Sequence, residues 1–257
     1  MKLNMVRFGW PTPDTPYYFL HLCAENVTQD TEVAGVAVNG RRCRDFEARN
    51  DGRAAVPPVL RAQADKRELY IRVDWQKGDT FDVAVTLKSG ENSVELRESY
   101  TAAQEHGYWN RDWKYYAAHV VKETAGIDRV DEPVHAVLAM YMDRLTDAQR
   151  ELRVVEVDSQ TGEAREIRSQ VYAVSNWDKW QNINCQPTTT AQIAFLANVP
   201  ANGQRVYLFF YGNLNAPQPC YETDLCVSGE GYGLSIQNEY YTVNLHKDSG
   251  SIDEILP

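Results

Sequence analysis

The stretch 205–211, Arg-Val-Tyr-Leu-Phe-Phe-Tyr, constrains the fold of this chain more than any other. Successive side chains of a β-strand point to opposite faces, so apolar or aromatic residues would cover both faces of a strand here. Such a strand must be packed on both sides, which predicts that it is central. Gly212-Asn213 and then Pro217 end the strand, because glycine favours a turn and proline cannot donate to a β-ladder.

Period-two alternation also marks the N-terminal part of the chain. Apolar residues alternate with mostly polar ones over 69–75, 81–87 and 94–96, and short turns at 77–79 and 89–92 separate these runs. A helical period does not fit these positions. Three alternating strands joined by short turns predict an antiparallel meander with one face in water.

The pattern over 133–141 is ambiguous, because apolar residues between 137 and 152 would also lie on one face of a helix. We favour a strand to about Tyr141, followed by one helical turn at 146–150 with Thr146 as its cap. The chain is therefore predicted to be all-β, apart from a turn or two of helix.

The predicted domain organisation follows from these alternating runs and from a change of composition after residue 99, where tyrosine and tryptophan are mixed with charged residues. The fold class predicted is all-β, with two antiparallel β-sandwich domains of immunoglobulin-like size plus terminal strands. The predicted segments are an immunoglobulin-like β-sandwich at 1–98, an aromatic-rich connector at 99–122, a second β-sandwich at 123–228 and the start of a further β domain at 229–257.

Composition excludes several classes of partner. Asp and Glu number 36 against 26 Lys and Arg, which gives a formal net charge of −10 and a pI near 5.0. Nucleic acid is not an expected partner, because phosphate binding needs clustered basic residues. No window approaches the roughly 18 to 20 apolar residues of a membrane span. We expect a soluble chain, either cytoplasmic or secreted or periplasmic after removal of a signal peptide.

The five cysteines are irregularly spaced, and none forms a Cys-x-x-Cys pair. Neither a zinc site nor a redox motif is indicated by this spacing. We therefore predict no metal site and no cofactor.

Aromatic residues next to polar ones form the first candidate site. Tryptophan rings can stack on the apolar faces of sugars, while neighbouring carboxylates bind hydroxyl groups. The alternative is that these rings cover the edge of a sandwich or a domain interface, where amphipathic aromatic residues are favoured in any case. The predicted substrate-binding residues are Trp109, Asp112, Trp113, Trp177, Asp178 and Trp180.

A second candidate site would catalyse β-elimination on an acidic polysaccharide. This reaction needs a base, an acid that protonates the leaving oxygen, and a cation beside the carboxylate. Nothing in their spacing brings suitable residues together, so the catalytic residues stay unknown. The candidates are His119 or His135 as base, Tyr115 or Tyr116 as acid, and Arg129 or Lys122 as cation.

Several stretches resemble modules of carbohydrate-active enzymes. Residues 123–134, followed by 152–155 and 169–171, resemble the opening of β-sandwich modules in secreted polysaccharide-degrading proteins. Tyr211-Gly212-Asn213 with Ala216-Pro217 is similar to the Tyr-Gly-Asn-Pro-x-Ala ending of the same modules, although a leucine stands here in place of the proline.

The C-terminal part carries a further resemblance. Residues 236–245 and 249–252 are similar to the first hairpin of the β-supersandwich domain of polysaccharide lyases and α-mannosidase-type hydrolases, a domain that also resembles galactose mutarotase. The chain stops at Pro257, directly after the apparent partner of the strand at 239–245. We expect a longer parent protein to continue beyond it.

The resemblance implies a carbohydrate-associated module, the non-catalytic N-terminal part or subunit of a polysaccharide-degrading enzyme. It transfers no catalytic residue. The implied partners are a polysaccharide or oligosaccharide and further domains or a catalytic subunit. Two alternatives stay open: a small enzyme, either a lyase or a glycoside hydrolase, and a purely structural or adhesive module.

Overall fold

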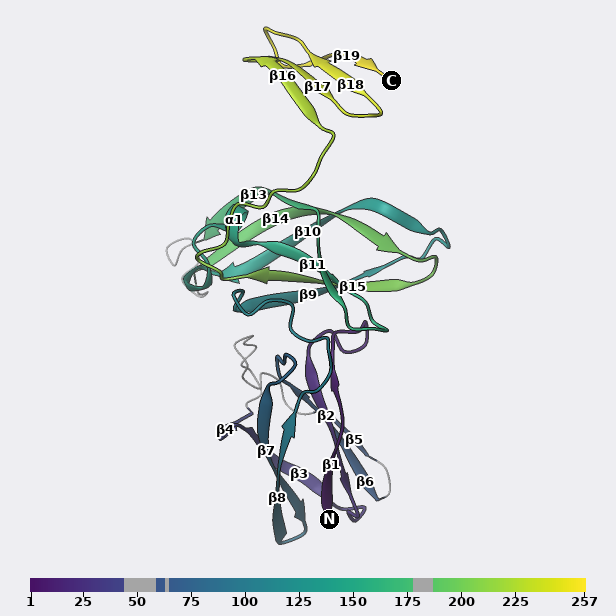
Figure 1. The fold of residues 1–257 in the computed structure, drawn as a ribbon, viewed down its shortest axis with the longest axis vertical. Helices are drawn as coiled ribbons and strands as arrows, with labels where there is room; N and C mark the ends of the chain where they lie inside the picture. The colour runs from purple at the N-terminus through teal and green to yellow at the C-terminus, as the bar shows by residue number, and fades with distance from the viewer. Residues whose placement is uncertain (44–58, 63–64, 178–186) are drawn as a thin grey trace. The chain divides into compact units, whose positions relative to one another are not determined.

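The computed structural model describes residues 1–43, 59–62, 65–177 and 187–257 (Figure 1). These residues form antiparallel sheets, and their helical structure consists of a 3-10 turn at Met142–Arg144 and the four-residue helix α1 (Ala148–Glu151). The prediction of an all-β fold with sandwich-like sheets is confirmed. The chain divides into two compact units, unit 1 (Met1–Gln218) and unit 2 (Pro219–Pro257).

Two four-stranded sheets form the N-terminal part of unit 1. The first has the strand order β1 (Lys2–Gly9), β2 (Phe19–Glu25), β6 (Lys66–Arg72), β5 (Val59–Ala62). The second has the order β4 (Arg41–Arg42), β3 (Glu32–Val38), β7 (Thr80–Ser89), β8 (Asn92–Thr101). Their inward side chains form one core whose largest fully buried member is Trp75.

The expected three-stranded meander is wrong in one pairing. Strands β7 and β8 pair as a hairpin, as predicted, but β6 pairs with β2 and β5 in the facing sheet. The chain crosses between the sheets after Arg72, and the Trp75 indole Nε1 donates to the carbonyl of Gly9 at 2.7 Å. A hairpin and a crossover between two sheets both show two alternating runs joined by a turn. The sequence pattern therefore does not distinguish these two connections.

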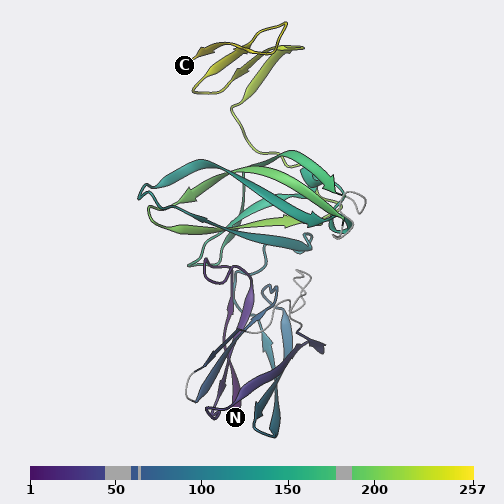
Figure 2. The same cartoon turned by 180° about the vertical axis from the view of Figure 1, so that it is seen from behind.

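The C-terminal part of unit 1 is a second pair of sheets, which face each other in both views (Figures 1 and 2). One sheet has the order β12 (Ala164–Ile167), β11 (Arg153–Val157), β15 (Gln204–Tyr211), β9 (Tyr115–Lys122). The other has the order β10 (Arg129–Tyr141), β14 (Thr188–Val199), β13 (Ser169–Trp177). The edge strand β9 therefore occupies the last third of the segment 99–122 that the sequence assigned to a connector.

Strand β15 is central, as the sequence predicted. It pairs with β11 on one side and with β9 on the other. Its two faces belong to different cores: Leu208 and Phe210 pack in the core shared with the N-terminal sheets, and Tyr207 and Phe209 pack against the sheet of β10, β14 and β13. Burial on both faces explains why this strand lacks the polar alternation of a half-exposed one.

The ambiguous region is resolved in favour of a strand, because β10 runs to Tyr141. The short helix begins at Ala148, and its N-cap is Asp147, whose carboxylate accepts from the backbone N–H groups of Gln149 and Arg150. Thr146 is therefore not the cap. Its backbone N–H and hydroxyl both donate to the carboxylate of Glu151 at 2.8 Å.

Unit 2 is a single antiparallel sheet with the order β16 (Cys226–Glu230), β17 (Gly233–Gln237), β18 (Thr242–Leu245), β19 (Ile252–Leu256). The expected C-terminal hairpin is confirmed as β18 and β19. Pairing aligns one residue from each strand in a row across the sheet, Val227, Ile236, Val243 and Ile255. Residues 219–257 are all described, and none of them is buried.

Candidate functional site

The predicted tryptophans differ in accessibility. Trp113 is buried, and its indole Nε1 donates to the carbonyl of Glu151 at 2.7 Å. Trp109 is half-buried, with its ring centroid 5.1 Å from that of Trp113 and 5.0 Å from that of Phe210. These two rings pack against each other and Trp109 packs against Phe210, while Trp113 also borders a surface groove.

The other predicted residues lie elsewhere. Asp112 is exposed on the same loop as the two buried rings. Trp177 is 51% exposed at the end of β13, in a different sheet. Asp178 and Trp180 lie outside the described residues. The structure thus brings together three of the predicted residues, Trp109, Asp112 and Trp113, and the site assignment itself stays a prediction.

A groove of about 570 Å³ lies beside this loop, between residues 111–114 and residues 212–217. We call it the loop groove. Its charged and amide side chains come from both segments, which the sequence separates by almost the whole of the second sandwich. They are Arg111, Asp112, Lys114, Asn213 and Asn215, with Trp113, Gly212, Leu214 and Pro217 completing the lining.

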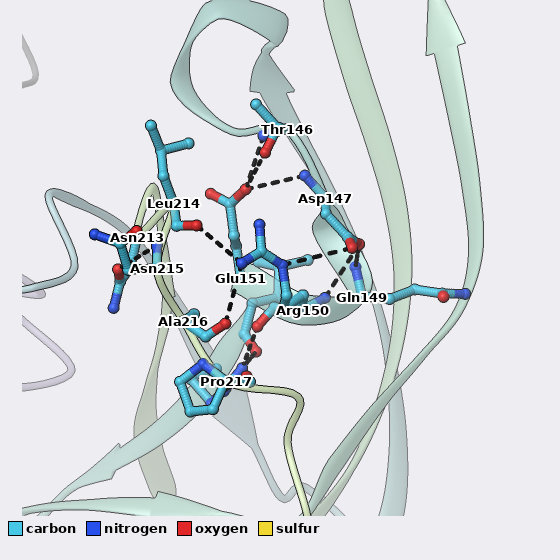
Figure 3. Close-up of polar contacts among 12 residues, drawn as sticks. Thr146, Asp147, Gln149, Arg150, Glu151, Asn213, Leu214, Asn215, Ala216 and Pro217 are labelled. Carbon is cyan, nitrogen blue, oxygen red and sulfur yellow. Dashed lines mark hydrogen bonds and ion pairs between the residues drawn. The ribbon is translucent and has the colours of Figure 1, made fainter.

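Two arginines donate hydrogen bonds to the 213–217 wall of the loop groove, and Figure 3 shows Arg150, the first of them, beside Leu214 and Ala216. Arg150 Nη1 donates to the carbonyls of Leu214 at 2.8 Å and Ala216 at 3.2 Å. Arg153 Nη2 donates to the carbonyl of Pro217 at 2.7 Å. Three carbonyls of the loop, those of residues 214, 216 and 217, are thereby tied to Arg150 in α1 and Arg153 at the start of β11, so contacts within the chain hold the wall.

The arginines are themselves fixed by neighbouring polar groups. Arg153 is buried, donates to the carbonyls of Arg150 and Leu152 at 2.7 Å, and forms an ion pair with Glu166 at 3.1 Å. Its guanidinium lies 5.3 Å from the centroid of the Trp113 ring. A buried guanidinium needs such partners, because an unpaired buried charge costs several kcal/mol.

Glu151 connects this arrangement to the preceding loop. It is fully buried, and its Oε1 accepts from the backbone N–H groups of Thr146 at 2.8 Å and Asp147 at 3.0 Å. Sequence reasoning did not find the roles of Arg150, Glu151 and Arg153. The sequence carries a signal for these roles, because three charged residues within four positions next to a buried strand need hydrogen-bond or ion-pair partners.

Gly212 forms the base of the loop groove. Its φ of +84° lies in the region that favours glycine, and an added Cβ would lie 2.6 Å from the Tyr115 ring and 2.9 Å from the carbonyl oxygen of Arg144. Only glycine therefore fits where β15 turns into the 213–217 wall.

The candidate lyase residues lie on two strands of facing sheets. Tyr115, Tyr116, His119 and Lys122 are on β9, and Arg129 and His135 are on β10. His119 is on β9, 4.5 Å from the Phe209 ring, and burial lowers its pKa. His135 is on β10, with its Nδ1 3.3 Å from the hydroxyl of Tyr172. The candidate cation Arg129 is 3.5 Å from the carboxylate of Glu123. The catalytic hypothesis stays a prediction.

Comparisons with known proteins return no family: no protein-family model matches the chain, and neither curated protein sequences nor solved structures provide a match. Within the described ranges, no group of three or more His, Cys, Asp or Glu is placed to hold a metal ion. The described part of the chain also contains no helix that is long and apolar enough to cross a membrane.

Proposed function

We propose that this chain is a carbohydrate-associated β-sandwich module that binds a polysaccharide or oligosaccharide in the loop groove. It would act as a non-catalytic part or subunit of a polysaccharide-degrading enzyme. The observation that carries the proposal is the groove of about 570 Å³ lined by cationic, anionic and amide side chains. Sugar hydroxyls donate and accept hydrogen bonds, so a mixed set of this kind suits them better than a groove of one charge.

The rigidity of the groove wall supports the same proposal. Ligand binding costs free energy when a loop must be ordered, and a wall that is already held loses less. The backbone carbonyls of residues 214, 216 and 217 are occupied by Arg150 and Arg153. The side chain of Asn215 is therefore presented to a ligand from a held backbone segment.

Binding measured by isothermal titration calorimetry tests the proposal, with neutral and uronate-rich oligosaccharides as probes. We expect at least one probe to bind, and Lys114→Ala or Asn215→Ala to weaken it about tenfold, about 1.4 kcal/mol. Lys88→Ala changes an exposed lysine on β7 and serves as the matched control. Absence of binding to every probe, or equal binding by the two groove variants and the control, would contradict the proposal.

A specific observation also favours the structural or adhesive alternative. The row Val227, Ile236, Val243 and Ile255 makes one face of unit 2 apolar, and Val227 and Ile255 are 59% and 56% exposed. Exposed apolar faces of this kind are typical of surfaces that pack against another protein or domain. A chain that binds no sugar but self-associates in sedimentation experiments, with association lost in Val227→Ser, would favour this alternative over the first.

A further inference from the structure

A second depression of about 340 Å³ lies in unit 1, away from the residues of the loop groove. It forms where the loop before β2, the end of β6, the start of β9, the 3-10 turn and the end of β15 meet. We call it the arginine–tyrosine pocket. The side chains that decide its chemistry are Tyr17, Arg72, Tyr116, Arg144 and Tyr211. Its volume falls within the range of roughly 300 to 1,000 Å³ that is usual for small-ligand sites.

The side chains that line the pocket are cationic, although a buried carboxyl lies nearby: burial and the charge of Asp74 raise the pKa of Tyr116. Arg72 and Arg144 both line it, and no Asp or Glu is among the described residues that do. This is notable in a chain of net charge −10, where a cationic site is not expected from composition. A ligand that enters the pocket therefore gains most if it carries an anionic group.

Tyrosine rings orient both guanidinium groups. The Arg72 guanidinium lies 5.7 Å from the ring centroid of Tyr17 and 5.0 Å from that of Tyr116. The Arg144 guanidinium lies 4.8 Å from the ring centroid of Tyr115. Cation–π contacts of this kind hold a guanidinium over the face of the ring.

Arg144 is further fixed by its neighbours in β15. Burial raises the pKa of Tyr211, and a hydrogen bond with Arg144 opposes that rise. The carbonyl of Arg144 faces Gly212, where a Cβ would lie only 2.9 Å away. Because a guanidinium has five N–H donors, one bond to Tyr211 leaves Arg144 able to bind a carboxylate with two parallel hydrogen bonds.

The walls of the pocket are apolar, since tyrosine rings and the methyl groups of Ala117 and Ala118 line it beside the arginines. A small inorganic ion would leave these walls without a partner. A ring with a carboxylate attached would place its charge on the arginines and its flat body against the tyrosines. We propose that the arginine–tyrosine pocket binds a carboxylate carried on a six-membered ring.

Two sources share this chemistry, a sugar acid and an aromatic acid. The test uses the full chain with D-galacturonate and benzoate as probes, and with D-galactose and benzamide as their uncharged counterparts, followed by titration calorimetry or ligand-observed NMR. We expect at least one acid to bind and its neutral counterpart to bind at least tenfold more weakly. Galacturonate alone would identify the sugar source, and benzoate alone the aromatic one.

Substitutions locate the site. Arg144→Gln and Arg72→Gln should each weaken binding of the acid about tenfold or more, and Arg144→Lys should recover part of it because it keeps the charge but not the planar fork. Lys114→Ala, in the loop groove, should leave this binding unchanged. Thermal melting of each variant establishes that it is folded, and Arg97→Gln on the exposed face of β8 is the matched control.

Three outcomes would overturn the inference: neither acid binds, the neutral counterparts bind as tightly, or Lys114→Ala abolishes binding while the arginine variants keep it. The last outcome would place the acid in the loop groove. Failure of oligosaccharides to bind the loop groove would not affect these measurements, so this inference and the proposed function fail separately.

Discussion

Strand β15 of unit 1 is apolar on both faces, and the strands of unit 2 carry an apolar row across one face, but only β15 is buried. In β15, residues Val206 to Phe210 are all at most 1% exposed. In unit 2, the apolar row across four strands contains no buried residue, and Ile252 beside it is 64% exposed. The two regions differ in whether another sheet covers the apolar face.

This difference shows that period two specifies a strand and its faces, whereas burial needs a second layer. Burying apolar surface contributes about 25 cal/mol per Å², and a single sheet gains this only where it packs. Unit 1 stacks its sheets around two cores. Within unit 2, residues 219–257, no second sheet covers the apolar face, and the following predictions test how far the two regions differ.

The largest expected difference comes from one substitution made in both units. Leu208→Ala removes a fully buried side chain from β15 and should lower the free energy of unfolding by about 2 to 5 kcal/mol. Leu234→Ala in β17 changes a half-exposed side chain and should cost less than about 1 kcal/mol.

Each effect can be measured in its own unit. All six tryptophans lie in unit 1, so urea denaturation followed by tryptophan fluorescence reports on that unit. Amide hydrogen exchange reports on unit 2. Equal costs for the two leucine substitutions would show that the apolar face of unit 2 is covered, and the contrast between the units would be lost.

The next prediction compares the loss of stability at two glycines of positive φ, one with atoms close to where a Cβ would lie and one with none within 4 Å. Gly212→Ala should destabilise unit 1 by about 1 to 3 kcal/mol, because the new Cβ meets Tyr115 and Arg144 in addition to the cost of positive φ. Gly90→Ala, in the β7–β8 turn with φ +58° and no atom within 4 Å of the new Cβ, should cost only about 1 kcal/mol. Urea denaturation of both variants checks the order, and a larger cost at Gly90 would contradict it.

A smaller effect should appear with pH. The backbone N–H groups of Asn202, Ala125, Gly126 and Ile127 donate to Glu123 and lower its pKa from 4.5 to about 2. A carboxylate with a lowered pKa stabilises the fold above its unfolded value, and this contribution is lost as the pH falls from about 4.5 towards 2.

Melting temperatures measured across this interval test the assignment. The Glu123→Gln variant should lose part of the acid sensitivity of unit 1, while Glu91→Gln, in an exposed turn, should keep it. Identical pH profiles for the wild type and Glu123→Gln would rule out this carboxylate as a source of acid sensitivity.

The smallest expected change in stability is on the open face of unit 2. Ile252→Thr should alter the free energy of unfolding by no more than about 0.5 kcal/mol, because its side chain is 64% exposed. The same substitution should reduce the fluorescence of a bound hydrophobic dye, whereas Glu254→Gln in the same strand should not. Strong destabilisation by Ile252→Thr would mean that this face is packed.

Much of the fold could be predicted from local patterns. The central position of β15, the hairpin of β7 and β8, the extension of β10 to Tyr141 and the C-terminal hairpin all follow from alternation and turn residues. The partner of β6 could not be predicted, because a turn between two alternating runs is compatible with a hairpin and with a crossover between sheets.

Part of the candidate site could be predicted, since Asp112 and Trp113 line the loop groove. Trp113 and Asp112 were singled out as sugar-binding residues, but the indole of Trp113 is buried between Glu151 and Arg153. A tryptophan beside polar residues in the sequence is compatible with packing in the core and with binding a sugar. Only the tertiary surroundings of the ring distinguish these two roles. The arginines that hold the groove wall were missed, because their partners are carbonyls more than sixty positions away.

The sequence by itself determined where this chain is extended, where it turns and which faces of its strands are apolar, because these depend on neighbouring residues and on steric limits within a few positions. Tertiary structure alone decided which sheets face each other, which aromatic rings are buried, and that Arg72 and Arg144 share a pocket. Those outcomes depend on contacts between distant segments, whose free energy is gained only when the whole of unit 1 packs.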